Sequence, residues 1–124
     1  MKPVPKISEA EWTVMKVIWK RFPITAAEVI EALSESTEWK PKTIGTLINR
    51  LVKKGALQFE KRGKVHYYAP AVSQERCLEQ ESRTFLNRYF GGALNPLLAH
   101  FFEKENLTPE DIRAIKEMVD RLED

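Results

Sequence analysis

The chain has 124 residues, of which 43% are hydrophobic, and its formal net charge is +2 at pH 7. This length suits one small domain or one domain with an appendage, and the lack of an apolar run of about 18 residues argues against a membrane span. One cysteine, Cys77, and two separated histidines, His66 and His100, supply no set of metal ligands and little for catalysis. We therefore expect neither an enzyme nor a bound cofactor. The first residues contain no apolar core of a signal peptide, and a single cysteine fits a reducing compartment, so a cytoplasmic location is expected.

The overall charge conceals two regions of opposite sign. Residues 1–72 carry 13 Lys and Arg against 7 Asp and Glu, a net charge of +6, whereas residues 73–124 carry 7 against 11, a net charge of −4. Within residues 40–64 there are 8 basic residues and one acidic residue, Glu60. Such a local excess of positive charge favours a polyanionic partner, although charged surfaces without a partner are also common. The acidic region is interpreted as a solubilising surface.

Two segments near the N-terminus carry the signature of a capped helix start. In the first, Ser8 can cap the helix and Glu11 lies three residues later. In the second, Thr25 and Glu28 have the same spacing. In this arrangement each side chain of the pair accepts a hydrogen bond from the backbone N–H of the other residue. The pattern predicts two helices, over about residues 8–21 and 25–34.

The stretch "WKPKTIGTLINRLVKKG" predicts a third helix, which Pro41 begins and Gly55 ends. Apolar residues recur at helical spacing along one side: Ile44, Leu47, Ile48, Leu51 and Val52. The other side holds polar, small and basic residues without an acid: Lys42, Thr43, Gly45, Thr46, Asn49, Arg50 and Lys53. One side is therefore expected to pack in a core, and the other to face a negatively charged partner.

A hairpin is predicted directly after the third helix. Leu57 and Phe59 alternate with polar residues, Gly63 falls at a turn, and the segment "VHYY" that follows is rich in strand formers. Three helices followed by a two-stranded hairpin are the order of a winged helix-turn-helix domain, whose last helix reads DNA. The expected fold class is mainly α with a small β-hairpin wing, and the winged helix-turn-helix domain is placed at residues 1–72.

The character of the sequence changes at Ser73. A helix is predicted from there to Gly91, followed by the short segment "NPLLAHFFEKEN" and by a last helix that Thr108 and Asp111 begin with a looser capping pair. These helices carry more apolar residues than one copy of so short a region can bury. We expect residues 73–124 to form an α-helical dimerisation region, and packing back onto the winged domain is the alternative. The predicted interface consists of Leu78, Phe85, Leu86, Tyr89, Phe90, Leu97, Leu98, Phe101, Ile112, Ile115, Val119 and Leu122.

Eight residues are predicted to contact DNA. Residues near the N-terminus of the third helix are expected to read base edges in the major groove, those further along to contact phosphates, and those at the wing tip to contact the backbone or the minor groove. In that order the residues are Lys42, Thr43, Thr46 and Asn49; Arg50 and Lys53; and Arg62 and Lys64. A ninth residue, Lys54, is grouped with Arg50 and Lys53 as a further candidate for a phosphate contact. The alternatives are that the threonines are ordinary helix surface, that Lys53 and Lys54 complement the helix dipole, and that the wing cations protect a strand edge.

Three segments together resemble the penicillinase repressor family, which includes the BlaI-type, MecI-type and copper-responsive repressors. The segments are "ISEAEWTVMKVIWK", "WKPKTIGTLINRLVKKG" and "FFEKENLTPEDI", and the likeness extends over nearly the whole chain. The matching residues are Glu11, Trp12, Val17, Trp19, Pro41, Lys42, Thr43, Thr46, Arg50, Leu51, Lys54 and Gly55. The resemblance implies a homodimeric transcriptional repressor that binds inverted-repeat DNA operators and dimerises through its C-terminal helices. It also places Lys42, Thr43 and Thr46 at the family's base-facing positions.

The resemblance further implies how repression would end. The copper-responsive branch ends in paired cysteines, and nothing after Cys77 supplies them, so copper sensing is not expected. The β-lactam branch controls β-lactamase and other antibiotic-resistance genes. Its members are inactivated by a membrane-bound sensor metalloprotease that cuts an Asn-Phe bond in the dimerisation region. His100 and Phe101 align with that bond and are the candidate cleavage site, with His in place of Asn.

Two positions depart from the family pattern. Gly45 stands where relatives often have Arg or Gln, and Lys40 stands at a helix cap where relatives usually have Ser. Three alternative functions stay open at this point. The chain could regulate genes of the same type with another inducer, or it could be a winged-helix module that binds protein instead of DNA. It could also sense a small ligand in a pocket of aromatic residues, formed by Phe85, Tyr89, Phe101 and Phe102.

Overall fold

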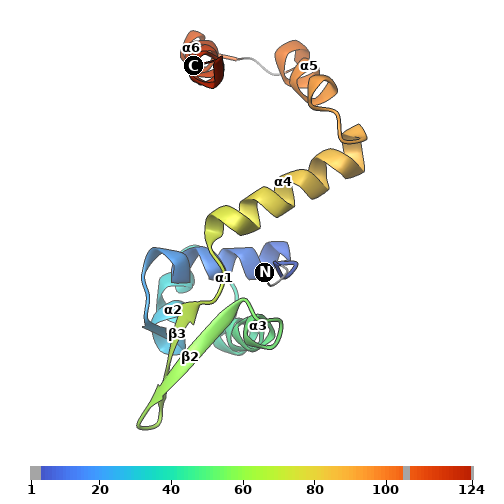
Figure 1. Ribbon diagram of the computed structural model, residues 1–124. Helices are drawn as coiled ribbons and strands as arrows, with labels where there is room; N and C mark the ends of the chain where they lie inside the picture. Colours follow the sequence, from blue (N-terminus) through green and yellow to red (C-terminus); the bar gives the residue numbers. More distant parts are fainter. Residues whose placement is uncertain (1–3, 105–106, 124) are drawn as a thin grey trace. The chain divides into compact units, whose positions relative to one another are not determined.

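The structure is a computed structural model that describes residues 4–104 and 107–123. It contains two compact units, Met1–Glu81 and Ser82–Asp124, called here the N-terminal unit and the C-terminal unit. The elements in chain order are α1 (Glu9–Lys20), β1 (Ile24–Thr25), α2 (Ala26–Ser34), α3 (Pro41–Lys53), β2 (Leu57–Arg62), β3 (Val65–Pro70), α4 (Gln74–Phe90), α5 (Leu94–Lys104) and α6 (Pro109–Glu123) (Figure 1). The prediction of a mainly α fold with a small hairpin wing is confirmed.

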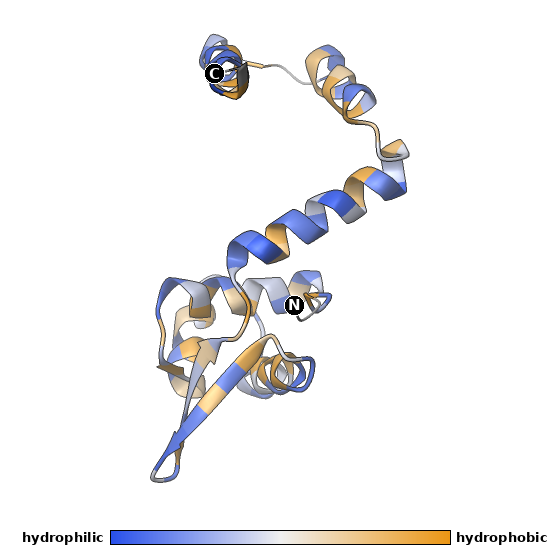
Figure 2. Ribbon diagram, in the orientation of Figure 1, coloured by the Kyte–Doolittle hydropathy of each residue, from blue (hydrophilic) through white to orange (hydrophobic). Residues whose placement is uncertain are grey.

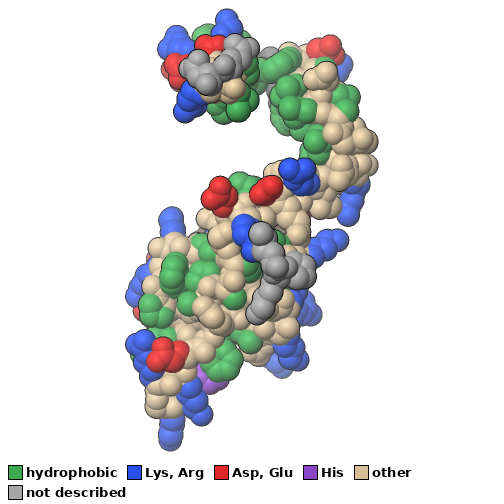
Figure 3. Space-filling model, in the orientation of Figure 1, with side chains coloured by type: hydrophobic (Ala, Val, Ile, Leu, Met, Phe, Trp, Pro, Cys, Tyr) green, Lys and Arg blue, Asp and Glu red, His purple; other side chains and the backbone are tan. Residues whose placement is uncertain are grey.

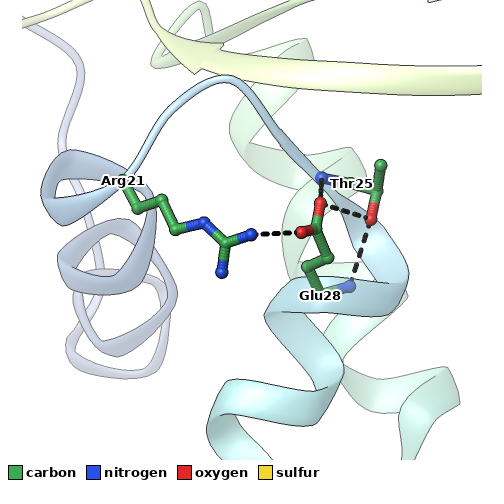
Figure 4. Close-up of polar contacts among 3 residues, drawn as sticks. All are labelled: Arg21, Thr25 and Glu28. Carbon is green, nitrogen blue, oxygen red and sulfur yellow. Dashed lines mark hydrogen bonds and ion pairs between the residues drawn. The ribbon is translucent and has the colours of Figure 1, made fainter.

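The first two helices begin with the predicted reciprocal caps. The Ser8 hydroxyl accepts a hydrogen bond from the N–H of Glu11 at 3.2 Å, and the Glu11 carboxylate accepts one from the N–H of Ser8 at 2.8 Å. Thr25 and Glu28 make the same pair of bonds at 3.2 and 3.1 Å, and Arg21 adds an ion pair to Glu28 (Figure 4). The hydrogen bonds from Thr25 hold the pKa of Glu28 below its usual value. Both helix starts are therefore fixed by residues that lie within one turn of each other.

Three antiparallel strands form the sheet, in the order β1-β3-β2. The predicted hairpin is confirmed: Phe59 pairs with Tyr68, and Gly63 makes the turn with a φ of 64°. The strand β1 was not predicted. In this strand Ile24 pairs with Tyr68 of β3, and Thr25 pairs with Tyr67. A two-residue strand is too short to show the alternation by which strands are recognised.

The core of the N-terminal unit lies between the three helices and the base of the hairpin. The side chains with no measurable exposure include Val14, Met15 and Ile18 of α1, Val29 of α2, and Ile44 and Leu51 of α3. Leu57 and Tyr68 bring the base of the hairpin into the same cluster. Beyond that base the hairpin extends away from the helices (Figure 1). Since one side of α3 is held in this core, the opposite side is left on the surface.

The first turns of α4 belong to the N-terminal unit. Cys77 is 3% exposed and lies in its core, and the side chain of Gln80 donates to the carbonyl of Val4 at 3.0 Å. The indole N–H of Trp19 donates at 2.9 Å to the carbonyl of Val72, which lies just before α4. The compact unit therefore continues to Glu81, beyond the boundary that composition predicts after residue 72.

The C-terminal unit consists of the rest of α4 with α5 and α6. The predicted cap of α6 is present, because the Thr108 hydroxyl accepts from the N–H of Asp111 at 3.0 Å and the Asp111 carboxylate accepts from the N–H of Thr108 at 3.1 Å. The predicted segment at residues 95–106 forms α5, except that residues 105 and 106 lie outside the described part. Figure 2 shows hydrophobic residues along α5 and α6, and none of the described side chains of this unit is buried.

Candidate nucleic-acid interface

The recognition helix of the predicted domain is α3, and the backbone sets where it starts. Pro41 occupies its first turn, and the N–H groups of Thr43 and Ile44 donate to the carbonyl of Lys40 at 2.9 and 3.2 Å. The Lys40 side chain makes no capping hydrogen bond, as expected for a residue that cannot accept one. The positive end of the helix dipole and the charge of Lys40 both favour an anion near the start of α3.

The exposed side of α3 carries all six of the residues predicted there. Lys42, Thr46, Asn49 and Lys53 follow one another at intervals of three or four residues, so they form a continuous stripe, and Thr43 and Arg50 lie beside it. No residue of α3 is acidic. A phosphate backbone could therefore approach this surface, called here the α3 face, without repulsion from a like charge.

The Thr46 hydroxyl is engaged within the helix. It donates to the carbonyl of Lys42 at 3.0 Å, one turn earlier. A threonine hydroxyl has one donor and two acceptor positions, so its oxygen stays available to accept from a base, and its methyl group is free to contact thymine. In this rotamer, contact with DNA through Thr46 would therefore use the oxygen or the methyl group.

Lys54 is paired within the protein. Its ammonium group donates to the carboxylate of Glu11 at 2.6 Å and to the carbonyl of Lys6 at 2.8 Å, and Glu11 is 2% exposed. Burial raises the pKa of Glu11, but the hydrogen bonds from Lys54 and Ser8 outweigh burial and hold that pKa below its usual value. Lys54 therefore neutralises a buried carboxylate and ties the end of α3 to the start of α1, a role that its sequence position did not reveal.

Arg50 and Lys53, in contrast, extend from the end of α3 and are exposed. Together with Ser8, Glu11 and Lys54 they line an open pocket of about 470 Å³. Since Lys54 already balances Glu11, the positive charges of Arg50 and Lys53 are in excess at this pocket. Excess positive charge suits a phosphate group, and the phosphate contacts of these two residues stay a prediction.

The wing adds a second group of cations. Arg62 and Lys64 are both exposed at the turn of the hairpin. The Arg62 guanidinium lies 4.8 Å from the centre of the Tyr67 ring and 3.5 Å from the Glu60 carboxylate. Lys61 is a further exposed cation on β2 that the predicted set omits, although its place in the hairpin was visible in the sequence. Figure 3 shows Lys and Arg side chains at the end of the hairpin and on the α3 side of the same unit.

The other predicted residues lie mostly in the C-terminal unit. All twelve residues predicted for the dimer interface are exposed or half-buried, from Leu122 at 85% exposure to half-buried residues such as Ile115. His100 and Phe101 are exposed near the end of α5. The described residues, 4–104 and 107–123, include no cluster of His, Cys, Asp or Glu suited to a metal, and no helix among them is long and apolar enough to cross a bilayer.

The chain has clear relatives among known proteins. It is 43% identical to the penicillinase repressor of Bacillus licheniformis over 97% of this chain and 94% of that protein. It is 35% identical to the methicillin resistance regulatory protein MecI of Staphylococcus aureus over 94% of both. Among solved structures, the Bacillus licheniformis BlaI monomeric form in complex with the blaP half-operator matches with 51% identity and a TM-score of 0.53 over 60% of this chain and 92% of that one.

These similarities confirm the predicted resemblance and the winged-helix fold. They also identify the chain as a DNA-binding repressor and not as an enzyme. The family description that matches residues 7–121 is that of the penicillinase repressors, and the chain belongs to the penicillinase repressor family.

Proposed function

We propose that this protein is a homodimeric repressor that binds inverted-repeat operators in the cytoplasm. The observation that carries the proposal is the α3 face, which is exposed, positively charged and free of acidic residues while the opposite side of the helix is held in the core. An α-helix fits the major groove of B-DNA, and positive charge supplies most of the affinity for a phosphate backbone. The relative whose structure contains a half-operator supports DNA as the partner.

In this proposal the interface residues have three roles. Residues in the first turns of α3 read base edges, residues in its last turn contact phosphates, and the wing contacts the backbone or the adjacent minor groove. In that order they are Lys42, Thr43, Thr46 and Asn49; Arg50 and Lys53; and Arg62 and Lys64. Lys54 is not included, because its ammonium group is paired with Glu11.

The C-terminal unit is proposed to form the dimer. Its apolar side chains are left exposed in a single chain, for example Tyr89 at 63% and Val119 at 48% exposure. A second copy of the same surface would cover them, and a two-fold dimer presents two α3 helices to the two halves of an inverted repeat. The prediction that residues 73–124 serve as the dimerisation region is retained, with the first turns of α4 attached to the N-terminal unit.

The controlled genes are proposed to be those of β-lactam resistance, because the relatives are named as a penicillinase repressor and as a regulator of methicillin resistance. Induction is proposed to occur through a membrane-bound sensor metalloprotease that cuts between His100 and Phe101. Both residues are exposed, but they lie within α5, so the helix must unwind locally before a protease can bind its backbone in an extended form.

Mass spectrometry of the protein from cells treated with a β-lactam would test this route. The expected product is an N-terminal fragment that ends at His100. An intact chain during full derepression would contradict cleavage and would favour a different inducer.

DNA reading is tested with duplexes that the chain itself selects from a random-sequence library. Thr46→Ala should weaken binding to the selected duplex by about 1–3 kcal/mol, the usual size of a base contact, and should change binding to a scrambled duplex little. An equal loss on both duplexes would contradict base reading by Thr46. A wild-type chain that binds no duplex at low salt would instead favour a protein-binding module.

A further inference from the structure

Gly45 is unusual among the glycines of this chain. The other four, Gly55, Gly63, Gly91 and Gly92, all have positive φ values, which glycine adopts more readily than any other residue. Gly45 lies in the interior of α3 and has no positive φ. Its backbone conformation is therefore open to any residue that forms helices.

The packing of the chain gives no reason for a glycine at this position. Apart from its chain neighbours and the backbone of α3 itself, a Cβ atom added to Gly45 would have no atom within 4 Å, so an alanine would meet open space. Glycine in a helix interior lowers stability relative to alanine, because it loses more backbone freedom on folding. The protein thus carries a destabilising residue in its proposed recognition helix, and no contact among the described residues requires it.

Gly45 adjoins the stripe of the α3 face. Lys42 lies three residues before it and Asn49 four residues after it, so both are its neighbours on the helix surface. Thr46 follows it directly in the chain. The missing side chain leaves a low point between two groups that can donate to base edges, a lysine and an asparagine amide.

We propose that the 5-methyl group of a thymine occupies this low point, so that Gly45 is a specificity-determining residue of the DNA interface. This inference rests on the proposed function. The thymine methyl is the apolar group that a base pair presents in the major groove, and it needs no hydrogen bond there. With no side chain at Gly45, the backbone of α3 approaches the base pair closely enough for Lys42 and Asn49 to reach the bases on either side.

Gly45→Ala in the full-length protein tests the proposal, because it should raise the thermal stability of the protein and lower its affinity for DNA. The midpoint of thermal unfolding should rise by about 4–8 °C, because the helix gains a better helix former without a clash. Affinity for the duplex that the wild-type chain selects should fall by about tenfold, because the added methyl collides with the thymine methyl. Affinity for a scrambled duplex should stay the same. Thr13→Ala, a change to alanine on α1 away from the α3 face, is the control and should leave binding to both duplexes unchanged.

Removing the methyl group from the DNA is the decisive comparison. Uracil in place of thymine at the critical position should restore the affinity of Gly45→Ala to within about twofold of the wild-type protein on the same DNA. If Gly45→Ala binds the selected duplex as tightly as the wild type, or if uracil restores nothing, the proposal is wrong. If the wild-type chain selects no sequence at all, the proposed function itself has failed, which is a different result from either of these.

Discussion

The two units of this chain differ in the burial of their apolar side chains. In the N-terminal unit, residues such as Val14, Ile18 and Leu51 have no exposed surface. In the C-terminal unit no described side chain is buried, and residues such as Phe85 and Leu122 are 45% and 85% exposed. Since apolar surface in water costs free energy roughly in proportion to its area, the first unit buries its core residues within one chain, and the second leaves apolar surface that the proposed dimer would cover. The difference teaches that the apolar residues of the first unit serve its own folding, and it supports the proposal that those of the second unit serve assembly.

The largest expected effect is on assembly. Val119→Glu would place a carboxylate on each side of a symmetric interface without a partner for either charge. The dimer dissociation constant, measured by sedimentation equilibrium, should rise several thousandfold. This rise corresponds to a loss of about 5 kcal/mol in the free energy of dimerisation. Ala114→Glu adds the same charge to another side of α6 and should leave the dimer intact. A wild-type chain that sediments as a monomer at all concentrations would contradict the proposal that the C-terminal unit buries its apolar residues in a dimer.

A substitution in the core of the N-terminal unit should lower the stability of that unit alone. Leu51→Ala removes a side chain that is fully buried in the core, and it should lower the free energy of unfolding by about 3 kcal/mol in urea titrations. The change should not depend on protein concentration, because the lost contacts all lie within one chain. A loss below about 1 kcal/mol would mean that the N-terminal core tolerates cavities and is less closely packed than its burial indicates.

The Glu11–Lys54 pair gives a smaller effect that depends on pH. Lys54→Met leaves the Glu11 carboxylate nearly buried without its cation, and it should lower stability at pH 7 by about 2 kcal/mol. This value is below that of a fully buried pair, because the Lys54 side chain is 33% exposed. Lys16→Met, a substitution of an exposed lysine on α1, is the control and should change stability little.

The pH dependence follows from the direction of the Glu11 shift. The pKa of Glu11 is lowered on folding, so its stabilising contribution is complete above the unfolded value, near 4.5, and is lost as the pH falls through the lower folded value. The stability difference between the wild type and Lys54→Met should therefore shrink in urea titrations between pH 6 and pH 3. An equal difference at both ends of that range would argue that Lys54 acts by packing alone.

The smallest effect is expected at a phosphate contact. Lys53→Ala should weaken binding to selected and scrambled duplexes alike, and it should reduce the slope of log affinity against log salt by about 0.9, the value for one phosphate contact. Lys16→Ala removes the same charge from α1 and should leave the slope unchanged. If Lys53→Ala also leaves the slope unchanged, Lys53 makes no phosphate contact.

Much of the N-terminal unit could be predicted because its signals are local. The pairs Ser8–Glu11 and Thr25–Glu28 lie within a turn of helix, so their spacing in the sequence is enough to predict the caps. The strand β1 and the partner of Lys54 were missed for the opposite reason. Each depends on a residue more than 40 positions away, Tyr68 for Ile24 and Glu11 for Lys54.

The sequence by itself determined the order of the helices and the hairpin, the family, and the polar composition of the α3 face, because all of these depend on residue spacing and identity. Only the tertiary structure decided which cations remain available, where the N-terminal unit ends, and that the glycine in α3 has open space around it. Those properties depend on which distant segments meet when the core closes, and periodicity along the chain carries no information about such contacts.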